Sequence, residues 1–390
     1  MHIVLVAKYP LPAESTSGGV ERVVEIFRRA LAHRAKVTLV VPNSEAGLTC
    51  RDALGTIIYI KRTVLPQSLN YWSLASRAVG SIIEQVDPDI VHVHDLAGLA
   101  MTWTRSADRI RPQRIFTVHG VLEKDIVHAR GHDLPRRLST PVRAWMVSNI
   151  ERASRSRYNR IVVINDYVLD AYPDIRMMEW TAIPNPVDRI FLEQPSARVS
   201  PQAKAQLLMV GVVERRKNIM AGIDILQHLI AGGIKARLDV IGRITDTHYR
   251  DRCQQRAVAV GVAESLTFHG AAAPSAIVEW MDRSDALLLP SKQETAPMVV
   301  AEAHCRGLPC AAPRAFGLVS MIDEGVDGVF IDVDNPASAA ASVRALLQGR
   351  VDHSMICARA ATKYDETEIV TRTLELYYDC SALGVTSASV

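Results

Sequence analysis

Short apolar runs rich in β-branched residues recur along the chain, and this recurrence constrains the fold more than any other feature of the sequence. Runs of this length and composition are typical of strands that are buried on both faces of a sheet. We therefore expect strands at the following places: Ile3–Ala7, Val37–Val41, Thr56–Ile60, Ile90–His94, Ile115–His119, Ile161–Ile164, Leu207–Val213, Arg237–Ile241, Ala286–Leu289 and Gly328–Val333.

Helical patterns lie between several of these runs. The clearest extends from Val20 to Leu31, with apolar residues spaced along one helical face and charged residues between them. Alternation of strand and helix is typical of parallel sheets whose strands are joined by right-handed crossovers. The predicted fold class is therefore α/β, with doubly wound, Rossmann-like sheets.

The chain is long enough for two domains, because 390 residues exceed what one hydrophobic core usually organises. The alternating pattern also runs twice, with an interruption by proline and polar residues between Asn185 and Ser196. We predict one Rossmann-like domain over 1–188 and a second over 189–370. The remaining segment, 371–390, is a candidate for a return to the N-terminal domain.

Composition argues against several classes of protein. No stretch approaches the roughly 20 apolar residues of a membrane-spanning helix, and the first residues resemble a buried strand rather than a signal peptide. We therefore expect a soluble, cytoplasmic protein. The net charge of +3 is too small to indicate nucleic acid as a partner. The six cysteines include no C-x-x-C pair, which argues against a structural zinc site or a disulfide framework.

A glycine pair precedes the first predicted helix. Gly18 and Gly19 would let the backbone approach a ligand closely, and free N–H groups at a helix N-terminus suit a phosphate or a hydroxyl. A plain junction between loop and helix explains the pair equally well. Neither G-x-G-x-x-G nor the P-loop pattern occurs, which argues against dinucleotide dehydrogenases and NTPases.

Three consecutive cations follow the first strand of the second half. Arg215, Arg216 and Lys217 stand between that strand and a helical stretch that begins at Ile219. Ligands of open α/β sheets bind at the carboxyl ends of the strands, so cations at this point could neutralise a diphosphate. A solvated basic turn is the alternative, and the sequence supports the two interpretations about equally.

Two glutamates flank the start of a predicted helix. Glu294 ends a polar loop, Pro297 lies in the first turn, and Glu302 follows about one and a half turns into the helix. A diphosphate could bind at the positive end of this helix while the carboxylates accept hydrogen bonds from hydroxyls on either side. Apolar residues surround Glu302 in the sequence, where a carboxylate without a partner would be costly.

Together these segments resemble the family 4 glycosyltransferases of the GT-B fold, and the resemblance extends over nearly the whole chain. It rests on Glu294-x7-Glu302, Gly307–Ala312, Val210-Gly211 with Lys217-Asn218, and Gly18-Gly19. The resemblance implies an acceptor domain followed by a donor domain across a cleft. It also implies a retaining, metal-independent transfer from a nucleotide diphosphate sugar, UDP- or GDP-linked, without a cofactor.

The same resemblance assigns roles to particular residues. Glu294 would bond the hydroxyls of the donor sugar, Glu302 those of the ribose, and Lys217 the diphosphate. The glycine pair would face the diphosphate from the first domain. His119, which follows a predicted strand, matches the family histidine near the transferred sugar.

The chain also departs from the family pattern. Val212 stands where many members have an arginine, so Arg215 or Arg216 would have to replace that contact with the diphosphate. Pro186 replaces a more usual glycine, and Pro297 supplies no N–H to a phosphate. The backbone donors that remain at the helix start are those of Ala296, Met298 and Val299.

A metal site is possible but not favoured. Three histidines, His92, His94 and His119, lie on or after neighbouring predicted strands and could gather around a metal. The D-x-D sequence Asp87-Pro88-Asp89 precedes a strand and so lies at the wrong end for chemistry. We expect no metal, with the lysine of the basic turn and the helix dipole supplying positive charge.

The expected activity is transfer of a sugar to a glycan, a lipid-linked molecule or a small molecule, as in polysaccharide biosynthesis. A GT-B fold also serves sugar-nucleotide epimerases, and the loss of an arginine at Val212 could leave a protein that binds nucleotide sugars without turnover. Transfer requires donor and acceptor, epimerisation requires the donor alone, and a binding protein releases no nucleotide.

An arginine-rich stretch, 128–160, is a candidate for peripheral contact with an anionic membrane at the inner face. Only Asp133 and Glu151 oppose its eight arginines, and Trp145 adds apolar bulk. The arginines are Arg130, Arg136, Arg137, Arg143, Arg152, Arg155, Arg157 and Arg160. A solvated helix face that carries a crossover between strands is the alternative.

Overall fold

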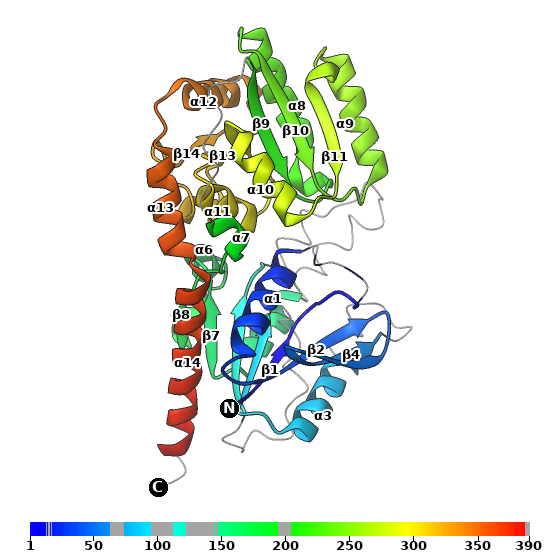
Figure 1. Cartoon of the computed structure of the whole chain (residues 1–390), viewed down its shortest axis with the longest axis vertical. Coiled ribbons are helices and arrows are strands. Elements are labelled where there is room, and N and C mark those ends of the chain that lie inside the picture. The colour runs from blue at the N-terminus through cyan, green and yellow to red at the C-terminus, as the bar shows by residue number, and fades with distance from the viewer. Residues whose placement is uncertain are drawn as a thin grey trace. The chain divides into compact units, whose positions relative to one another are not determined.

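The computed structural model describes residues 1–12, 14, 16, 18–62, 74–94, 112–121, 145, 147–193 and 204–386. The chain forms two compact units, Met1–Pro186 with Glu366–Val390, and Val187–Asp365. Each unit is a mainly parallel sheet covered by helices, so the predicted fold class is confirmed (Figure 1).

The first unit is built on an eight-stranded sheet with the order β3-β4-β2-β1-β5-β6-β7-β8. Neighbouring strands are parallel except at one edge, where β3 pairs with β4 in the antiparallel sense. The strands are β1 (His2–Val6), β2 (Lys36–Ser44), β3 (Leu48–Asp52), β4 (Gly55–Lys61), β5 (Ile90–His94), β6 (Gln113–Val118), β7 (Arg160–Val163) and β8 (Trp180–Ala182). The helical elements are α1 (Gly19–Leu31), α3 (Ser76–Val86), α6 (Asp166–Ala171), η4 (Pro173–Met177) and α14 (Glu366–Thr386).

The second unit has a six-stranded parallel sheet with the order β11-β10-β9-β12-β13-β14. Its strands are β9 (Ala205–Val210), β10 (Ala236–Ile241), β11 (Leu266–Gly270), β12 (Ala286–Leu288), β13 (Cys310–Pro313) and β14 (Gly328–Ile331). Its helical elements are α7 (Arg189–Leu192), η5 (Arg215–Lys217), α8 (Ile219–Ala231), α9 (Thr247–Ala259), η6 (Ala263–Ser265), α10 (Pro274–Arg283), α11 (Met298–Cys305), η7 (Phe316–Ser320), α12 (Pro336–Gln348) and α13 (His353–Tyr364).

Successive side chains of the second sheet belong to two different cores. Leu207 packs into one cluster with residues of α8, α9 and α12, whereas Leu208 packs into another with residues of α10, α11 and α13. Adjacent residues of a strand point to opposite faces, so both faces of this sheet are buried under helices. This burial explains why the strands are continuous apolar runs in the sequence.

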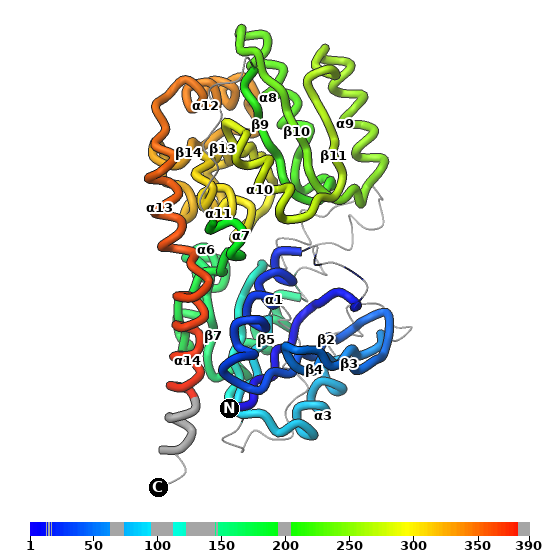
Figure 2. The backbone as a smooth tube through the Cα atoms, viewed as in Figure 1, coloured from blue at the N-terminus to red at the C-terminus, as the bar shows by residue number. Residues whose placement is uncertain are grey.

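The chain passes into the second unit after Pro186 and returns to the first after Asp365, slightly earlier than the predicted boundaries at 188 and 370. Val187 and Phe191 are fully buried in the core of the second unit, so the chain enters that unit at Val187 rather than at a free linker. At the other end, α14 already begins at Glu366 and belongs to the first unit. The path of the chain from α13 into α14 can be followed in Figure 2.

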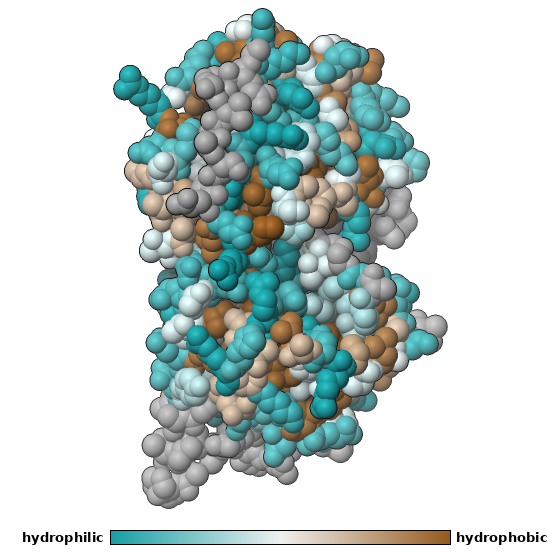
Figure 3. All heavy atoms as spheres, in the orientation of Figure 1, coloured by the Kyte–Doolittle hydropathy of each residue, from teal (hydrophilic) through white to brown (hydrophobic). Residues whose placement is uncertain are grey.

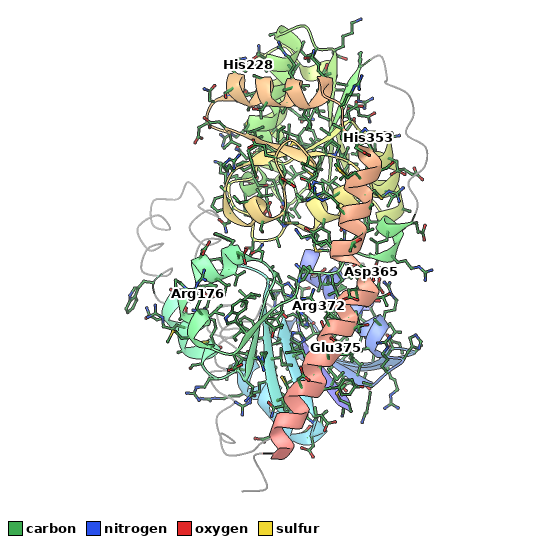
Figure 4. The ribbon with its side chains drawn as sticks, turned by 90° about the vertical axis from the view of Figure 1, so that its left-hand side faces the viewer. Arg176, His228, His353, Asp365, Arg372 and Glu375 are labelled. Carbon is green, nitrogen blue, oxygen red and sulfur yellow. The ribbon has the colours of Figure 1, made fainter. Side chains whose placement is uncertain are left out.

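Polar contacts attach α14 to the rest of the first unit. Glu366 pairs with Arg29 of α1 at 2.9 Å, and Nη2 of Arg372 donates to the carbonyl oxygen of Ala182 at 2.6 Å. Figure 4 labels Arg372 on α14 and Asp365 just before the helix begins. The return of the chain to the first unit therefore starts five residues before 371.

The sequence analysis missed β3, β8, β11 and β13. The first three are edge strands, with partly exposed side chains and no continuous apolar run. β13 is fully buried, but its sequence, Cys-Ala-Ala-Pro, consists of small residues and proline. Weak apolar signals of these kinds do not distinguish a strand from a loop.

No helix among the described residues is long and apolar enough to cross a membrane. Hydrophilic residues are spread over the face of the molecule drawn in Figure 3, with apolar residues between them.

Candidate active site

The basic turn directly follows β9, at the carboxyl end of the second sheet. It forms the short helical element η5, and Asn218 then adopts a left-handed conformation, with φ of 53°, before α8 begins. Gly211 leaves space for the lysine, since a Cβ atom there would lie 3.1 Å from Cε of Lys217. The glycine that ends the strand thus allows the lysine stem to pass over the backbone.

The side chains of Lys217 and Arg216 both contact Glu294, which lies in the loop between β12 and α11. Nζ of Lys217 donates to Oε1 of Glu294 at 2.6 Å, and Nη1 of Arg216 lies 3.4 Å from Oε2. The same Nη1 donates to the carbonyl oxygen of Gln293 at 3.1 Å, and the amide of Lys292 donates to the carbonyl oxygen of Arg216 at 2.9 Å. The structure therefore joins three of the predicted site residues directly.

Glu294 is ionised although its side chain is almost fully buried. Burial alone would raise the pKa of this carboxyl, but the charges of Lys217 and Arg216, with a hydrogen bond from Lys217, hold the pKa below its usual range. The carboxylate has about four acceptor sites, so it can bind further hydroxyl groups while it retains both cations.

The helix α11 begins beside this cluster, one residue later than predicted. Pro297 is the N-cap residue, not part of the first turn, because its ψ of 114° is extended. The amide of Val300 already donates to the carbonyl oxygen of Pro297, whereas those of Met298 and Val299 belong to the open first turn. These two amides, with that of Ala296 in the preceding loop, are the donors that the sequence analysis expected there.

Glu302 is the fifth residue of α11, little more than one turn from its start and closer than predicted. Its side chain is 2% exposed among Val299, Val300 and Ala303, which are also buried. The backbone of the loop that precedes the helix is fixed too, since the amide of Gly317 donates to the carbonyl oxygen of Glu294 at 3.2 Å.

Arg215 points to a different neighbour from Arg216. Its Nε lies 3.6 Å from Asp246, and its guanidinium stands 5.9 Å from the ring centre of Tyr249. Both partners belong to the start of α9. Of the two arginines considered as replacements for the missing family arginine, only Arg216 contacts Glu294.

Val212 has an arginine beside it in the segment that follows the neighbouring strand, β10. The register pairs Val210 with Ile241, so Gly242 follows beside Gly211 and Arg243 beside Val212. The two strand ends come very close, because a Cβ atom on Gly242, with φ of +156°, would overlap the carbonyl oxygen of Gly211. Arg243 is exposed at this end of the sheet.

The glycine pair of the first unit forms the start of α1. Gly18 is the N-cap, and its amide donates to Oε2 of Glu21 at 3.1 Å. Its φ of −109° is open to any residue, so the structure does not require glycine there for conformational reasons. The carboxylate of Glu21 thus already accepts a hydrogen bond from the amide of Gly18, one of the donors that the sequence analysis assigned to a ligand.

His119 lies in a buried group of three imidazoles. Its Nε2 is 2.9 Å from Nδ1 of His94, and the two rings are stacked. His92 uses both ring nitrogens, with Nδ1 2.6 Å from the hydroxyl of Tyr377 on α14 and Nε2 2.7 Å from Oγ1 of Thr117. The strands β5 and β6 bring these residues together, as parallel neighbours do.

Burial keeps this histidine group neutral. It lowers the pKa of His92 and of His119 to about 3, and that of His94 well below its usual range, although a contact with Asn185 partly opposes the shift at His119. Among the residues that the structure describes, no set of three His, Cys, Asp or Glu side chains could hold a metal ion.

A pocket of about 310 Å³ opens in the first unit beside the start of α1. Lys8 and Tyr9, just after β1, line one side, and Glu21 of α1 lines another. Its remaining lining residues are Leu11, Glu14, Val41, Pro42, Asn43, Ser44 and Glu45. The sequence analysis did not find this pocket, because its residues come from loops whose approach depends on the folded sheet.

The arginine-rich stretch lies only partly within the described residues. Arg130, Arg136, Arg137 and Arg143 fall outside them. Arg155 is buried and forms a bidentate pair with Asp174, and Arg160 pairs with Glu179 at 2.9 Å. These two arginines therefore have partners within the protein, whereas Trp145 is 69% exposed.

Two protein-family models together match most of the chain. Residues 17–190 match the model described as Glycosyltransferase Family 4, and residues 191–364 match the model described as Glycosyl transferases group 1. The chain belongs to the family 4 glycosyltransferases. The boundary between the two matches falls close to the position where the structure changes from one unit to the next.

Individual relatives are distant from this family 4 chain. A D-inositol 3-phosphate glycosyltransferase of Catenulispora acidiphila is 28% identical over 199 residues, and the match covers 47% of each protein, so the chain spans about half the length of that relative. The glycogen synthase of Mycobacterium tuberculosis is 26% identical over 302 residues, 74% of this chain and 68% of the relative.

Solved structures with the same fold match the chain over almost its full length. Sucrose-phosphate synthase from Thermosynechococcus elongatus has a TM-score of 0.77 and 16% identity, with 98% of this chain and 99% of that chain covered. HepE from Anabaena in complex with UDP-glucose has a TM-score of 0.71 and 15% identity, with 97% and 100% covered. The fold of this family 4 member is thus GT-B.

Proposed function

We propose that the chain is a glycosyltransferase that transfers a sugar from a nucleotide diphosphate donor. The observation that carries this proposal is the contact of Lys217 and Arg216 with the buried carboxylate of Glu294, beside the N-terminus of α11. Two cations and a helix N-terminus suit a diphosphate, and the remaining acceptor sites of the carboxylate suit the hydroxyls of a sugar.

In the proposed reaction the diphosphate is the leaving group. Lys217 retains two further N–H donors beyond its bond to Glu294, and the amides of Met298 and Val299 lie at the positive end of α11. Donors held in place in this way stabilise the charge that develops on the departing oxygen. Glu302, buried one turn further along, is proposed to bind the ribose hydroxyls.

We propose that transfer retains the anomeric configuration and needs no metal ion. A leaving-group oxygen would take the proton of the acceptor hydroxyl on the same face, so that no residue acts as a covalent nucleophile. The resemblance to family 4 supports this mechanism, and the cations at the diphosphate site supply the charge that a metal would otherwise provide. Activity should then persist in the presence of EDTA.

A UDP-linked donor is the first choice to test, since HepE from Anabaena was crystallised with UDP and with UDP-glucose. Arg243 is proposed to supply the diphosphate contact that Val212 cannot, because it is exposed at the adjacent strand end. The acceptor is proposed to bind the first unit, where Glu14, Glu21 and Glu45 line the pocket and favour a hydroxylated molecule over an anionic one.

The arginine-rich stretch, 128–160, is proposed to hold the protein at an anionic membrane surface on the cytoplasmic side. Arg152 and Arg157, with exposed Trp145, are the described residues that could contribute. A glycan carried on a lipid would then be presented to the enzyme, which fits a role in polysaccharide biosynthesis.

The proposed function is tested by nucleotide release from a panel of UDP-, GDP- and ADP-sugars, with and without candidate acceptors. We expect release that requires both donor and acceptor, and product with the anomeric configuration of the donor. Turnover of the donor alone to an epimer, or no turnover with any donor and acceptor, would contradict the proposal.

A further inference from the structure

A second pocket lies in the second unit and shares no residue with the candidate active site. It has a volume of about 330 Å³, which is within the range in which proteins bind small molecules. His304, at the C-terminal end of α11, forms part of its wall. The other walls are the segment Val319–Asp323 and the helix α13, which runs from His353 to just before Asp365 in Figure 4.

Two buried polar atoms in this wall have no hydrogen-bond partner among the described residues. They are Nε2 of His304 and the hydroxyl of Tyr364, on side chains that are 3% and 5% exposed. A buried polar atom without a partner is costly, and polar groups of this kind in native proteins usually bind something. Both residues line the pocket, although the two atoms themselves have almost no accessible surface, so a small movement of either side chain would bring its polar atom to a ligand there.

The protonation of His304 determines what its free nitrogen can bind. Burial lowers the pKa of His304 to about 4, so the imidazole is neutral near neutral pH. Its hydrogen bond to the backbone of Asp327 holds the one ring proton on the other nitrogen, and Nε2 is left as an acceptor. The partner of Nε2 must therefore donate, as a hydroxyl does and a phosphate oxygen does not.

The charged residues of the pocket balance each other. Arg359 pairs with Asp323 at 3.0 Å, and Lys363 donates to the carbonyl oxygen of Ser320 at 3.0 Å, which leaves it two further donors. With Asp327 also in the wall, two cations stand against two carboxylates. This balance disfavours an anionic ligand and provides both donors and acceptors for hydroxyl groups.

An apolar surface completes the lining. Met321, Ile322 and Ile356 are buried side chains that face the same space. A sugar ring or similar polyol has C–H groups that pack against such residues and hydroxyls that alternate between donating and accepting. The mixture of groups in the wall matches that pattern.

We propose that this pocket is a binding site for a neutral, polyhydroxylated ligand of about monosaccharide size, separate from the donor site. His304 and Asp327 accept hydrogen bonds from the hydroxyls of the ligand, Lys363 donates to them, and the hydroxyl of Tyr364 gains a partner. The proposal does not depend on the proposed function.

Methyl NMR of the whole chain tests this site, with glucose, galactose, mannose and myo-inositol as probes. We expect the methyl signals of Met321, Ile322 and Ile356 to shift with at least one probe, and excess UDP not to reverse the shifts. His304→Phe and Lys363→Met should each weaken that binding by about tenfold, because each removes one hydrogen-bonding group. The exposed Lys235→Met is the matched control and should leave binding unchanged.

Several outcomes would overturn the proposal. They are the absence of any shift with all four probes up to about 50 mM, shifts confined to Met298 at the donor site and reversed by UDP, or equal binding by both pocket variants and the control. Glucose 6-phosphate binding here more tightly than glucose would contradict the neutral class of ligand. The thermal unfolding of His304→Phe shows whether that variant is folded, and Lys363→Met tests the site through an exposed side chain.

Discussion

In the first unit three buried imidazoles contact one another, a tyrosine and a threonine, whereas in the second unit a buried carboxylate contacts a lysine and an arginine. The histidines lose their charge because burial is the dominant influence on their pKa values. Glu294 keeps its charge because two cations outweigh the effect of burial. Burial alone thus does not determine whether a polar cluster is charged, and the partners within reach decide it.

This difference separates the expected roles of the two clusters. The neutral histidines can donate and accept hydrogen bonds without attracting an anion. The charged cluster can attract a diphosphate and exchange one of its internal contacts for a contact with the donor. Variants that change one cluster should therefore produce effects of a different kind from variants that change the other.

The largest effect is expected for Lys217→Ala, which removes the cation that contacts Glu294 at 2.6 Å. We expect kcat/KM to fall by one to three orders of magnitude, roughly 1.4–4 kcal/mol, because the lysine is proposed to stabilise charge in the transition state. Steady-state kinetics with the accepted donor measures this. Lys292→Ala, which changes an exposed lysine in the loop between β12 and α11, is the control. Parental activity in Lys217→Ala would contradict a role for Lys217 at the diphosphate.

The two glutamates should differ in what they impair. Glu294→Gln should lower turnover by about tenfold to a hundredfold, because Glu294 is proposed to contact the reacting sugar, whereas Glu302→Gln should mainly weaken donor binding. Isothermal titration with the free nucleoside diphosphate discriminates between them. Unchanged affinity in Glu302→Gln would be incompatible with a ribose contact.

The neutral histidines should make the protein sensitive to mild acid. Their pKa values are about 6.5 in the unfolded chain and about 3 for His92 and His119 in the folded protein, so the unfolded state binds more protons between these values. The contribution of these histidines to the free energy of unfolding is fully present well above pH 6.5 and is lost as the pH falls from there toward 3. From pH 7 to 5.5 each such histidine should cost about 1.3 kcal/mol.

His92→Gln tests this expectation, since His92 is outside the proposed donor site. Urea unfolding at pH 7 and pH 5.5 should show a smaller loss of stability in the variant than in the parent, by about 1 kcal/mol. The lowered pKa of Glu294 favours its charged form, unlike the lowered pKa of a histidine. The stability that this carboxylate contributes is therefore lost only as the pH falls below its unfolded value of 4.5. An identical pH dependence in parent and variant would contradict the neutral assignment.

A smaller effect is expected for Arg243→Ala. If Arg243 replaces the family arginine beside Val212, donor affinity should fall by about tenfold, close to the value of one exposed charged contact. Val212→Arg in the same background should restore part of the loss. Equal affinity in parent and Arg243→Ala would leave Arg216 as the arginine that contacts the diphosphate.

The smallest effect is expected at the membrane surface. Each arginine near an anionic surface contributes on the order of 1 kcal/mol before screening, so Arg152→Glu with Arg157→Glu should reduce binding to anionic vesicles several-fold. Arg155 already has Asp174 as a partner and should contribute little to this binding. Cosedimentation at low and high salt measures it, and equal recovery with neutral vesicles would show that the acceptor is not presented by a membrane.

The sequence predicted most of the fold because buried parallel strands leave continuous apolar runs. It missed β13, which consists of small residues and proline, and three edge strands, β3, β8 and β11, in which burial is incomplete. It also predicted Lys217, Arg216 and Glu294 as one site, because all three follow strands of the same sheet.

Other features of the site depend on contacts that no local pattern encodes. The contact of His92 with Tyr377 joins residues 285 positions apart, and the choice between Arg215 and Arg216 depends on where Asp246 lies in the folded unit. The pocket lined by His304 and α13 is likewise formed by segments that are separate in the sequence. A sequence pattern identifies residue types at strand ends, but it does not show which neighbours they meet.

The central claim is that the basic turn and the start of α11 form a diphosphate site, and the most direct test compares UDP with UMP. Isothermal titration in EDTA should show UDP binding at least about tenfold more tightly than UMP, because Lys217, Arg216 and the helix N-terminus are proposed to contact the second phosphate. The difference should largely disappear in Lys217→Ala. Equal affinity of the parent protein for UDP and UMP, or for GDP and GMP, would contradict the account.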